Sequence, residues 1–181
     1  MTRVMIIRHG EKHAGTHEHG VSFEGVRTKH ELTVRGWQRA GALVRYFAPA
    51  GGMAADAPIS TPVSIFASAA TPASPSLRAQ HTVLPLAKVL GVEVNATHAE
   101  GAEMAVATAA VSAPAPVLIS WHHSQIPLLA KAIAGAGVGC PESWPDERFD
   151  LVWVLDRDES GGWRFSQVAQ RLFAEDAETL V

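Results

Sequence analysis

The sequence predicts an α/β protein with a three-layer α/β/α arrangement, a mostly parallel sheet and a C-terminal antiparallel hairpin. Three observations carry this prediction. Short apolar runs typical of strands alternate along the chain with segments whose apolar residues recur at helical spacing. Two of these runs, Val4–Ile7 and Val117–Ser120, are apolar almost throughout, which is typical of parallel strands buried on both faces. Two strand-like segments near the C-terminus flank the turn-rich segment Asp156–Gly162, as in a hairpin.

The first expected strand, Arg3–Ile7, leads into a long polar loop over Glu11–His30. Thr33 is typical of a helix N-cap, and apolar residues keep helical spacing from there to Phe47. The elements expected after that helix are strand Val63–Ala67, helix Leu77–Leu90 (interrupted at Pro85 and stopped by Gly91), strand Val92–Val94, helix Glu100–Val111, strand Val117–Ser120, helix Ile126–Ala134, and hairpin strands Leu151–Leu155 and Trp163–Val168.

Length and composition exclude several classes of protein. The chain has 181 residues, 47% hydrophobic and 18% charged, and we expect residues 1–181 to form a single domain. The formal net charge of −3 argues against binding to nucleic acid or to a membrane surface. No apolar run reaches the roughly 18 residues of a membrane-spanning helix, and the N-terminus lacks a signal-peptide pattern. Cys140 is the only cysteine, so we expect a cytoplasmic protein, with its oligomeric state open.

The most informative segment is Arg8-His9-Gly10, at the point where the first expected strand ends. Open α/β sheets bind ligands at the carboxyl ends of their strands. Arginine binds phosphate oxygens with its planar guanidinium, histidine serves as nucleophile or proton carrier, and glycine lets the backbone approach a ligand closely. The segment therefore predicts an anion-binding site with reactive chemistry.

A second histidine-rich segment, His122-His123, follows the strand Val117–Ser120. The carboxyl ends of two parallel strands meet at one edge of the sheet, so we expect this segment to share a site with His9. Arg78 adds a second cation near the start of a helix, where free N–H groups also favour an anion. Two arginines, two histidines and a helix start suit a phosphoryl group, whose oxygens carry spread negative charge.

These motifs resemble those of the histidine phosphatase superfamily, the phosphoglycerate mutase-like proteins. The resemblance extends from the start of the chain to about residue 155, and its four segments stand in the family's order. They are Arg8 to Glu11 (RHGE), Leu32 to Gly41 (LTVRGWQRAG), Ser76 to Thr82 (SLRAQHT) and Val117 to His123 (VLISWHH). The later segment Trp144 to Trp153 looks like that of a little-characterised bacterial branch.

The resemblance implies a role for each of these residues. His9 would attack phosphorus and carry a phosphohistidine, while Arg8, Arg78 and the second histidine would bind the phosphoryl group. A carboxylate would protonate the leaving oxygen, and neither a metal ion nor another cofactor would be required. The chemistry of the residues agrees, because neighbouring arginines lower the pKa of an imidazole and keep it neutral and nucleophilic.

The second site histidine is expected to be His123. Members of the family usually place a small residue after this histidine, and Ser124 follows His123, whereas His122 is followed by another histidine. Side chains alternate along a strand, so only one of the pair should face the site. His122 would then make a hydrogen bond beside the site or face solvent.

The general acid is expected to be Glu103, with Glu100 as the alternative. Many members of the family carry a glutamate after the helix that begins with the second arginine, and these two glutamates flank Gly101 in that segment. Near a helix start, either glutamate would instead interact with the helix dipole if it had no catalytic role. The longer acidic signature of the mutases is absent, so mutase activity is not expected.

We therefore expect a metal-independent phosphatase that acts on a small phosphorylated substrate or a phosphoprotein. One alternative is a binding module of the same fold, which would hold a phosphate ligand without a competent acid. Another is a metal-dependent hydrolase, because His9, His13 and His17 have the spacing of metal ligands on one face of a helix. The glycines Gly10 and Gly15 argue against such a helix.

Overall fold

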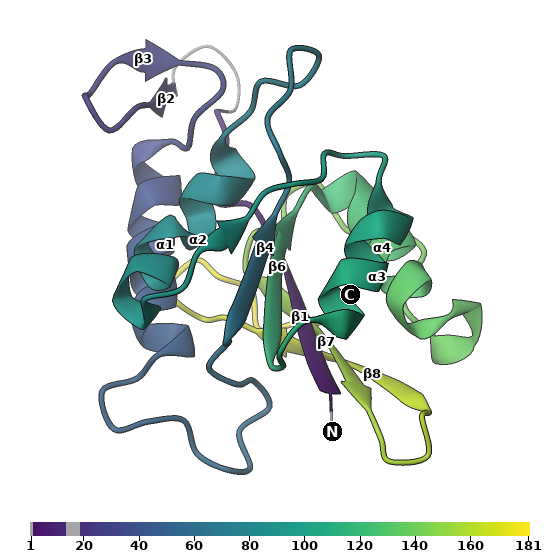
Figure 1. Ribbon diagram of the computed structural model, residues 1–181. Helices are drawn as coiled ribbons and strands as arrows, with labels where there is room; N and C mark the ends of the chain where they lie inside the picture. The colour runs from purple at the N-terminus through teal and green to yellow at the C-terminus, as the bar shows by residue number, and fades with distance from the viewer. Residues whose placement is uncertain (1, 14–18) are drawn as a thin grey trace.

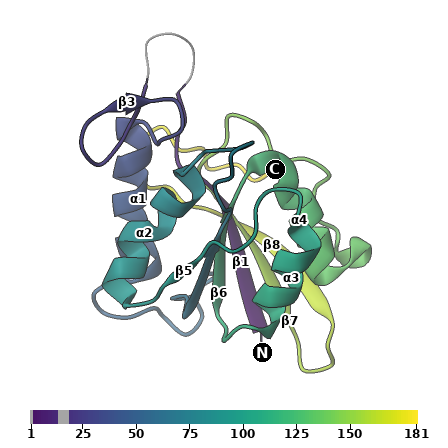
Figure 2. The same ribbon diagram turned by 45° about the horizontal axis from the view of Figure 1, so that its top comes forward.

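The structure, a computed structural model, describes residues 2–13 and 19–181. Figures 1 and 2 show three layers, with helices α1 and α2 on one face of a central sheet and helices α3 and α4 on the other. The expected α/β/α arrangement is confirmed. The elements are β1 (Thr2–Arg8), β2 (Gly20–Val21), β3 (Arg27–Thr28), α1 (Val34–Phe47), β4 (Ser64–Ala67), α2 (Arg78–Leu90), β5 (Val94–Asn95), α3 (Glu103–Ser112), β6 (Val117–Trp121), α4 (Ile126–Ala134), β7 (Leu151–Arg157), β8 (Trp163–Ala169), and two short 3₁₀ turns at His123–Gln125 and Ala136–Val138.

Six strands form the main sheet in the spatial order β5-β4-β6-β1-β7-β8. Strands β5, β4, β6 and β1 run parallel, with Val4 opposite Val117 between β1 and β6. Strand β7 pairs with β1 in the antiparallel sense, and β8 pairs with β7 in the same way to complete the edge. The mostly parallel sheet and the C-terminal hairpin are thus observed as expected, and β1 and β6 lie side by side at the centre.

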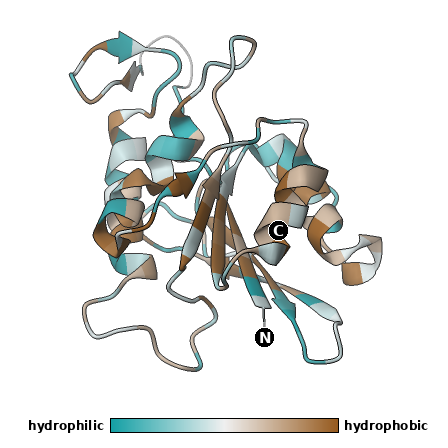
Figure 3. Ribbon diagram, viewed as in Figure 1, coloured by the Kyte–Doolittle hydropathy of each residue, from teal (hydrophilic) through white to brown (hydrophobic). Residues whose placement is uncertain are grey.

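The two faces of β1 belong to two separate hydrophobic clusters. Val4 and Ile6 pack in the cluster that includes α3 and α4, whereas Met5 and Ile7 pack in the cluster that includes α1 and α2. All four side chains are fully buried, and each such burial contributes roughly 1.5–3 kcal/mol to folding. Figure 3 shows the central strands in hydrophobic colours. The continuous apolar run in β1 follows from this burial on both faces.

Helices α1 and α2 begin and end where local chemistry predicts. The Thr33 hydroxyl accepts the N–H of Gly36 at 3.2 Å, so the expected N-cap of α1 is confirmed. Helix α2 ends at Gly91, whose φ of +67° is left-handed, as expected for a helix stop. Pro85 does not divide α2, which continues through it to Leu90.

Helix α3 begins later than the sequence indicates. The expected start was Glu100, but Gly101 adopts a φ of +93°, which no helix contains, and the helix begins at Glu103. Glu100 therefore stays in a turn outside the helix, and the two candidate acids have different surroundings. Within residues 2–13 and 19–181, no helix is long and apolar enough to cross a membrane.

The segment expected as a polar loop, Glu11–His30, contains a small antiparallel hairpin of β2 and β3. Trp37 of α1 donates its indole N–H to the Val21 carbonyl at 2.8 Å. Phe23, in the turn of the hairpin, stacks on Trp37 with ring centroids 4.5 Å apart. Two-residue strands carry no periodic signal, and their pairing depends on this docking against α1, which is why the sequence did not reveal them.

Candidate active site

The carboxyl ends of β1 and β6 bring the two histidine segments together. In their parallel register Arg8 lies opposite Trp121, and the His9 N–H donates to the Trp121 carbonyl at 3.2 Å. His122 directly follows the end of β6, and the ring centroids of His9 and His122 lie 5.8 Å apart. The two segments therefore share the sheet edge at which the sequence expects them.

The His9 imidazole is buried, with one nitrogen committed to a hydrogen bond and the other without one. Its Nδ1 lies 2.7 Å from the Gly10 carbonyl oxygen, which only accepts, so the proton sits on Nδ1. Nε2 then carries the lone pair, and it has no hydrogen-bond partner in the described part of the chain. Burial lowers the pKa of His9 well below 6.5, and the charges of Arg8 and Arg78 lower it further. A neutral imidazole of this kind can act as a nucleophile.

The turn after His9 is held against both helices of one layer. The Gly10 N–H donates to Thr82 Oγ1 at 2.7 Å, and the Thr82 hydroxyl donates to the Arg78 carbonyl at 2.7 Å. A Cβ on Gly36 would stand 2.6 Å from the Glu11 carbonyl oxygen, so α1 can approach the turn this closely only with glycine there. These contacts bring the first turn of α2, and with it Arg78, beside His9.

Arg8 is fully buried at the end of β1. Its guanidinium lies 3.8 Å from the centroid of the Phe149 ring, and Nη2 contacts Asp146 Oδ1 at 3.1 Å. Nη1 donates to the backbone carbonyls of Asp146 and Arg148. Burial lowers the pKa of Arg8 to about 10, although Asp146 opposes the shift, so Arg8 stays protonated at neutral pH. Its buried Nε has no partner among the described residues and is free to donate to an anion.

Arg78 is the first residue of α2 and supplies the second cation. Its Nη1 donates to the Lys29 carbonyl at 2.9 Å, and its buried Nε is without a partner within the described ranges. Burial lowers the pKa of Arg78, and the charges of Glu100 and Glu31 oppose that shift. Because the charge of Arg78 also lowers the pKa of His9, the two predicted arginines both lie close to this histidine.

The two adjacent histidines differ in their neighbours. The Nδ1 of His122 contacts Ser124 Oγ at 2.9 Å, which orients the ring beside His9 and leaves Nε2 for a ligand. His123 instead places Nε2 at 3.1 Å from Asp146 Oδ1. Burial lowers the pKa of His123 to about 4, so its ring is neutral at neutral pH and this contact is not an ion pair.

The second nitrogen of His123, Nδ1, is buried and has no hydrogen-bond partner within the described residues. The size of the following residue pointed to His123 in the sequence. In the structure, the register of β1 and β6 is what brings a histidine to His9, and that histidine is His122.

The two candidate acids also differ in their partners. Glu103 is buried, and its Oε1 accepts the Trp121 indole N–H at 3.2 Å and a backbone N–H at 2.9 Å. Glu100 is exposed in the turn before α3. Burial lowers the pKa of both Arg78 and His122, and the charge of Glu100 opposes the shift in both cases. The charge of Glu100 thus acts on Arg78 and His122, whereas Glu103 accepts the Trp121 indole N–H.

Metal-binding geometry is absent from the described ranges. Residues 2–13 and 19–181 contain no group of three or more His, Cys, Asp or Glu side chains that could hold a metal ion. His9 and His13 belong to an irregular segment and not to a helix. His17, the third residue of the alternative metal site, lies outside the described residues.

Solved structures of the same fold are similar to this chain along almost its whole length. A phosphoserine phosphatase from Entamoeba histolytica in complex with 3-phosphoglyceric acid matches with a TM-score of 0.54 and 14% identity, covering 95% of this chain and 99% of that chain. A mycobacterial glucosyl-3-phosphoglycerate phosphatase with inorganic phosphate matches with a TM-score of 0.52 and 17% identity, covering 93% and 96%. The chain has the histidine phosphatase fold. No protein-family model matches it, and no curated protein matches its sequence.

One residue beside the site of this histidine phosphatase fold was not among the candidates from the sequence. Asp146 Oδ1 contacts Arg8 and His123 and lies 3.4 Å from Lys12 Nζ. The charge of Lys12, followed by that of Arg8, lowers the pKa of Asp146. The contact with Arg8 joins residues 138 positions apart, so only the resemblance of segment 144–153 could have drawn attention to it.

Proposed function

We propose that this chain is a metal-independent phosphatase that hydrolyses a phosphomonoester through a phosphohistidine at His9. One observation carries the proposal. Among the buried nitrogen atoms without a hydrogen-bond partner within the described residues are Arg8 Nε, His9 Nε2 and Arg78 Nε, with His123 Nδ1 as a fourth at the same site. Buried polar groups without partners are rare in folded proteins and require an explanation. A phosphoryl group supplies one, because its oxygens accept from both arginines while its phosphorus faces the histidine lone pair.

In the first step, the Nε2 lone pair of His9 attacks phosphorus as the bond to the leaving oxygen breaks. Arg8 and Arg78 donate to the equatorial oxygens, where the transition state carries its charge. His122 donates from Nε2 to the same group. The Glu100 carboxylic acid gives its proton to the leaving oxygen, so the products are an alcohol and a phosphohistidine.

In the second step, water attacks the phosphorus on the side opposite His9. The Glu100 carboxylate accepts the water proton as the bond between nitrogen and phosphorus breaks. Inorganic phosphate leaves, His9 regains its lone pair, and Glu100 is again protonated. Every proton and electron pair is accounted for by these side chains, so the cycle needs no metal ion.

We propose a small phosphorylated molecule as the substrate, with a phosphoprotein as the alternative. The mycobacterial and Entamoeba phosphatases of this fold support the first choice, because their names give phosphorylated small molecules as substrates. The assignment of the second histidine to His122 rests on its ring contact with His9, and that of the acid to Glu100 rests on the effect of its charge on the pKa values of Arg78 and His122.

Trapping the phosphoenzyme tests the proposal. The protein is mixed with p-nitrophenyl phosphate, quenched at alkaline pH, where phosphohistidine survives, and digested for mass spectrometry. Phosphate is expected on His9, and His9→Ala is expected to lose both the phosphoenzyme and the release of p-nitrophenol. His98→Ala, which changes a histidine outside the site, is the matched control and is expected to retain both.

Three results would contradict the proposal. Continued turnover by His9→Ala would exclude His9 as the nucleophile. Phosphate binding with no phosphoenzyme and no turnover would instead indicate a binding module of the same fold. Loss of activity on addition of a chelator would favour the metal-dependent hydrolase.

A further inference from the structure

Two cavities next to the candidate site are lined by positively charged side chains. The first has a volume of about 400 Å³ and is lined by Lys12, Lys29 and Arg78 among others. The second has a volume of about 520 Å³ and includes Arg27. His13 and Lys29 line both cavities, so the two are adjacent. Among the described residues, no carboxylate lines either cavity.

The two cavities have positively charged linings, although the chain as a whole has a net negative charge. The protein has 18 acidic and 15 basic residues, yet the described residues of the linings include four arginines and lysines and no aspartate or glutamate. Like charges held close together repel, which favours the binding of an anion between them. We call Lys12, Arg27 and Lys29 the basic rim.

The basic rim lies next to the candidate active site. Arg78 lines the first cavity and also lowers the pKa of His9. Lys12 follows His9 by three positions, and its Nζ lies 3.4 Å from Asp146 Oδ1 beside Arg8. A ligand whose phosphoryl group lies at His9 therefore extends from there into the first cavity.

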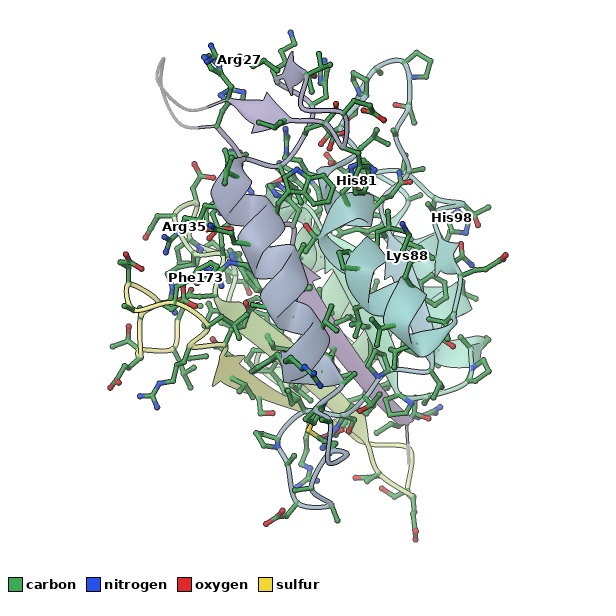
Figure 4. All side chains as sticks on the ribbon, turned by 90° about the vertical axis from the view of Figure 1, so that its left-hand side faces the viewer. Arg27, Arg35, His81, Lys88, His98 and Phe173 are labelled. Atoms are coloured by element: carbon green, nitrogen blue, oxygen red, sulfur yellow. The ribbon has the colours of Figure 1, made fainter. Side chains whose placement is uncertain are left out.

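Packing holds the rest of the basic rim in place. Arg27 is in β3 and Lys29 follows two positions later, and Figure 4 shows Arg27 on this hairpin above the start of α1. The hairpin docks through Phe23, whose ring centroid lies 4.5 Å from that of Trp37 and 5.0 Å from that of His81. Arg27 and Lys29 thus lie on, or directly after, a hairpin that packs against α1 and α2.

We propose that the substrate carries a second phosphate group, on the part that leaves as the alcohol, and that the basic rim binds it. This inference rests on the proposed function and names the substrate class of the same site. One phosphate meets His9, Arg8 and Arg78, and the other meets Lys29 and Arg27. A cavity of about 400 Å³ lies in the range of small-molecule sites, so a small bisphosphorylated molecule fits it.

The test compares glucose 6-phosphate with glucose 1,6-bisphosphate, which differ by one phosphate on the same scaffold. The wild-type protein is expected to have the higher kcat/KM with the bisphosphate. The double variant Arg27→Gln/Lys29→Gln is expected to lower the ratio of the two kcat/KM values about tenfold, a typical effect of two partly exposed charge contacts. Added salt is expected to reduce the ratio as well, because it screens these contacts.

Arg45→Gln is the matched control, since it removes one exposed arginine in the last turn of α1. It is expected to leave the ratio at the wild-type value. Equal kcat/KM for both sugars, an unchanged ratio in the double variant, or a preference for a phosphopeptide over both sugars would overturn the inference.

A separate measurement distinguishes failure of this inference from failure of the proposed function. Turnover of p-nitrophenyl phosphate and the phosphoenzyme report on the function alone. Calorimetric titration of His9→Ala with both glucose phosphates reports on the basic rim alone. Tighter binding of the bisphosphate, weakened by the Arg27→Gln/Lys29→Gln changes, supports the rim even in a protein without turnover, and equal binding of both sugars excludes it.

Discussion

Two histidines at the site differ in their surroundings. The Nδ1–H of His9 donates to the Gly10 carbonyl, so its Nε2 carries the lone pair. The Nε2 of His123 lies 3.1 Å from Asp146 Oδ1. One neutral ring is a candidate nucleophile and the other lies beside a carboxylate, so two residues of the same type have different surroundings within one site.

The first prediction separates the two adjacent histidines. His122→Ala is expected to lower kcat for p-nitrophenyl phosphate by roughly 10²-fold to 10³-fold, the usual effect of removing one donor to the transition state. His123→Ala is expected to have a much smaller effect, because His123 contacts Asp146. Steady-state kinetics of both variants test this prediction. A larger loss of kcat in His123→Ala would identify His123 as the histidine that binds the phosphoryl group.

The second prediction separates the two candidate acids. A general acid matters most when the leaving group is a poor one, so Glu100→Gln is expected to lower kcat more for glycerol 1-phosphate than for p-nitrophenyl phosphate. Glu103→Gln is the matched comparison, since its amide oxygen still accepts the Trp121 N–H, and its ratio of the two rates is expected to stay near that of wild type. A leaving-group-dependent loss confined to Glu103→Gln would restore Glu103 as the acid.

Among the helices and strands, the start of α1 holds the segment that follows His9 in place. Thr33 caps α1 and also donates its hydroxyl to the Glu11 carbonyl at 3.2 Å. The Thr33 N–H donates to the same carbonyl at 3.0 Å. These hydrogen bonds connect the segment after His9 to the N-terminus of α1. A change that weakens the cap therefore also weakens the support of that segment.

The third prediction concerns this cap. Thr33→Ala removes both hydroxyl hydrogen bonds and is expected to lower the free energy of unfolding by about 1 kcal/mol. Thr33→Ser keeps the hydroxyl and is expected to lose less. Urea unfolding of the three proteins measures the difference, and equal losses in both variants would assign the effect to the missing methyl group instead of the cap.

For the molecule as a whole, the C-terminal segment is tied to the site through α1. Arg39 is buried, and its guanidinium binds Glu11 at 2.8 Å and Asp176 at 2.7 Å. Asp176 also accepts the backbone N–H groups of Leu172 and Phe173. One guanidinium thus joins the residue two positions after His9 to the segment that follows β8.

The fourth prediction follows from the pKa of Asp176. Burial alone would raise this pKa, but the hydrogen bonds and charge of Arg39 lower it below 3.8. The contribution of Asp176 to stability is therefore full above pH 3.8 and is lost as the pH falls through the lower value of the folded state. Asp176→Asn is expected to reduce the free energy of unfolding at neutral pH by about 2 kcal/mol.

Urea unfolding at neutral pH and below pH 3.8 checks this prediction. The difference in the free energy of unfolding between wild type and Asp176→Asn is expected to shrink as the pH falls below 3.8, because the unfolded state takes up a proton at Asp176 before the folded state does. A difference that stays constant across the range would mean that the contact with Arg39 contributes no pH-dependent stability.

The sequence predicted the structural features that depend on the local pattern of residues. Apolar runs and helical spacing predicted the layers, the parallel strands and the hairpin, because burial on one or two faces dictates where apolar residues recur. The N-cap at Thr33 and the stop at Gly91 depend only on neighbouring residues, and both were predicted. The family motifs also marked Arg8, His9 and Arg78 before any geometry was known.

What depends on contacts between distant residues came from the folded structure alone. The register of β1 and β6 set His122 beside His9, and the left-handed Gly101 kept Glu100 outside α3. The docking of the hairpin on Trp37 likewise has no local signature. Sequence periodicity reports which face of an element is buried, whereas proton positions and pairings follow from neighbours that the chain brings together only when it folds.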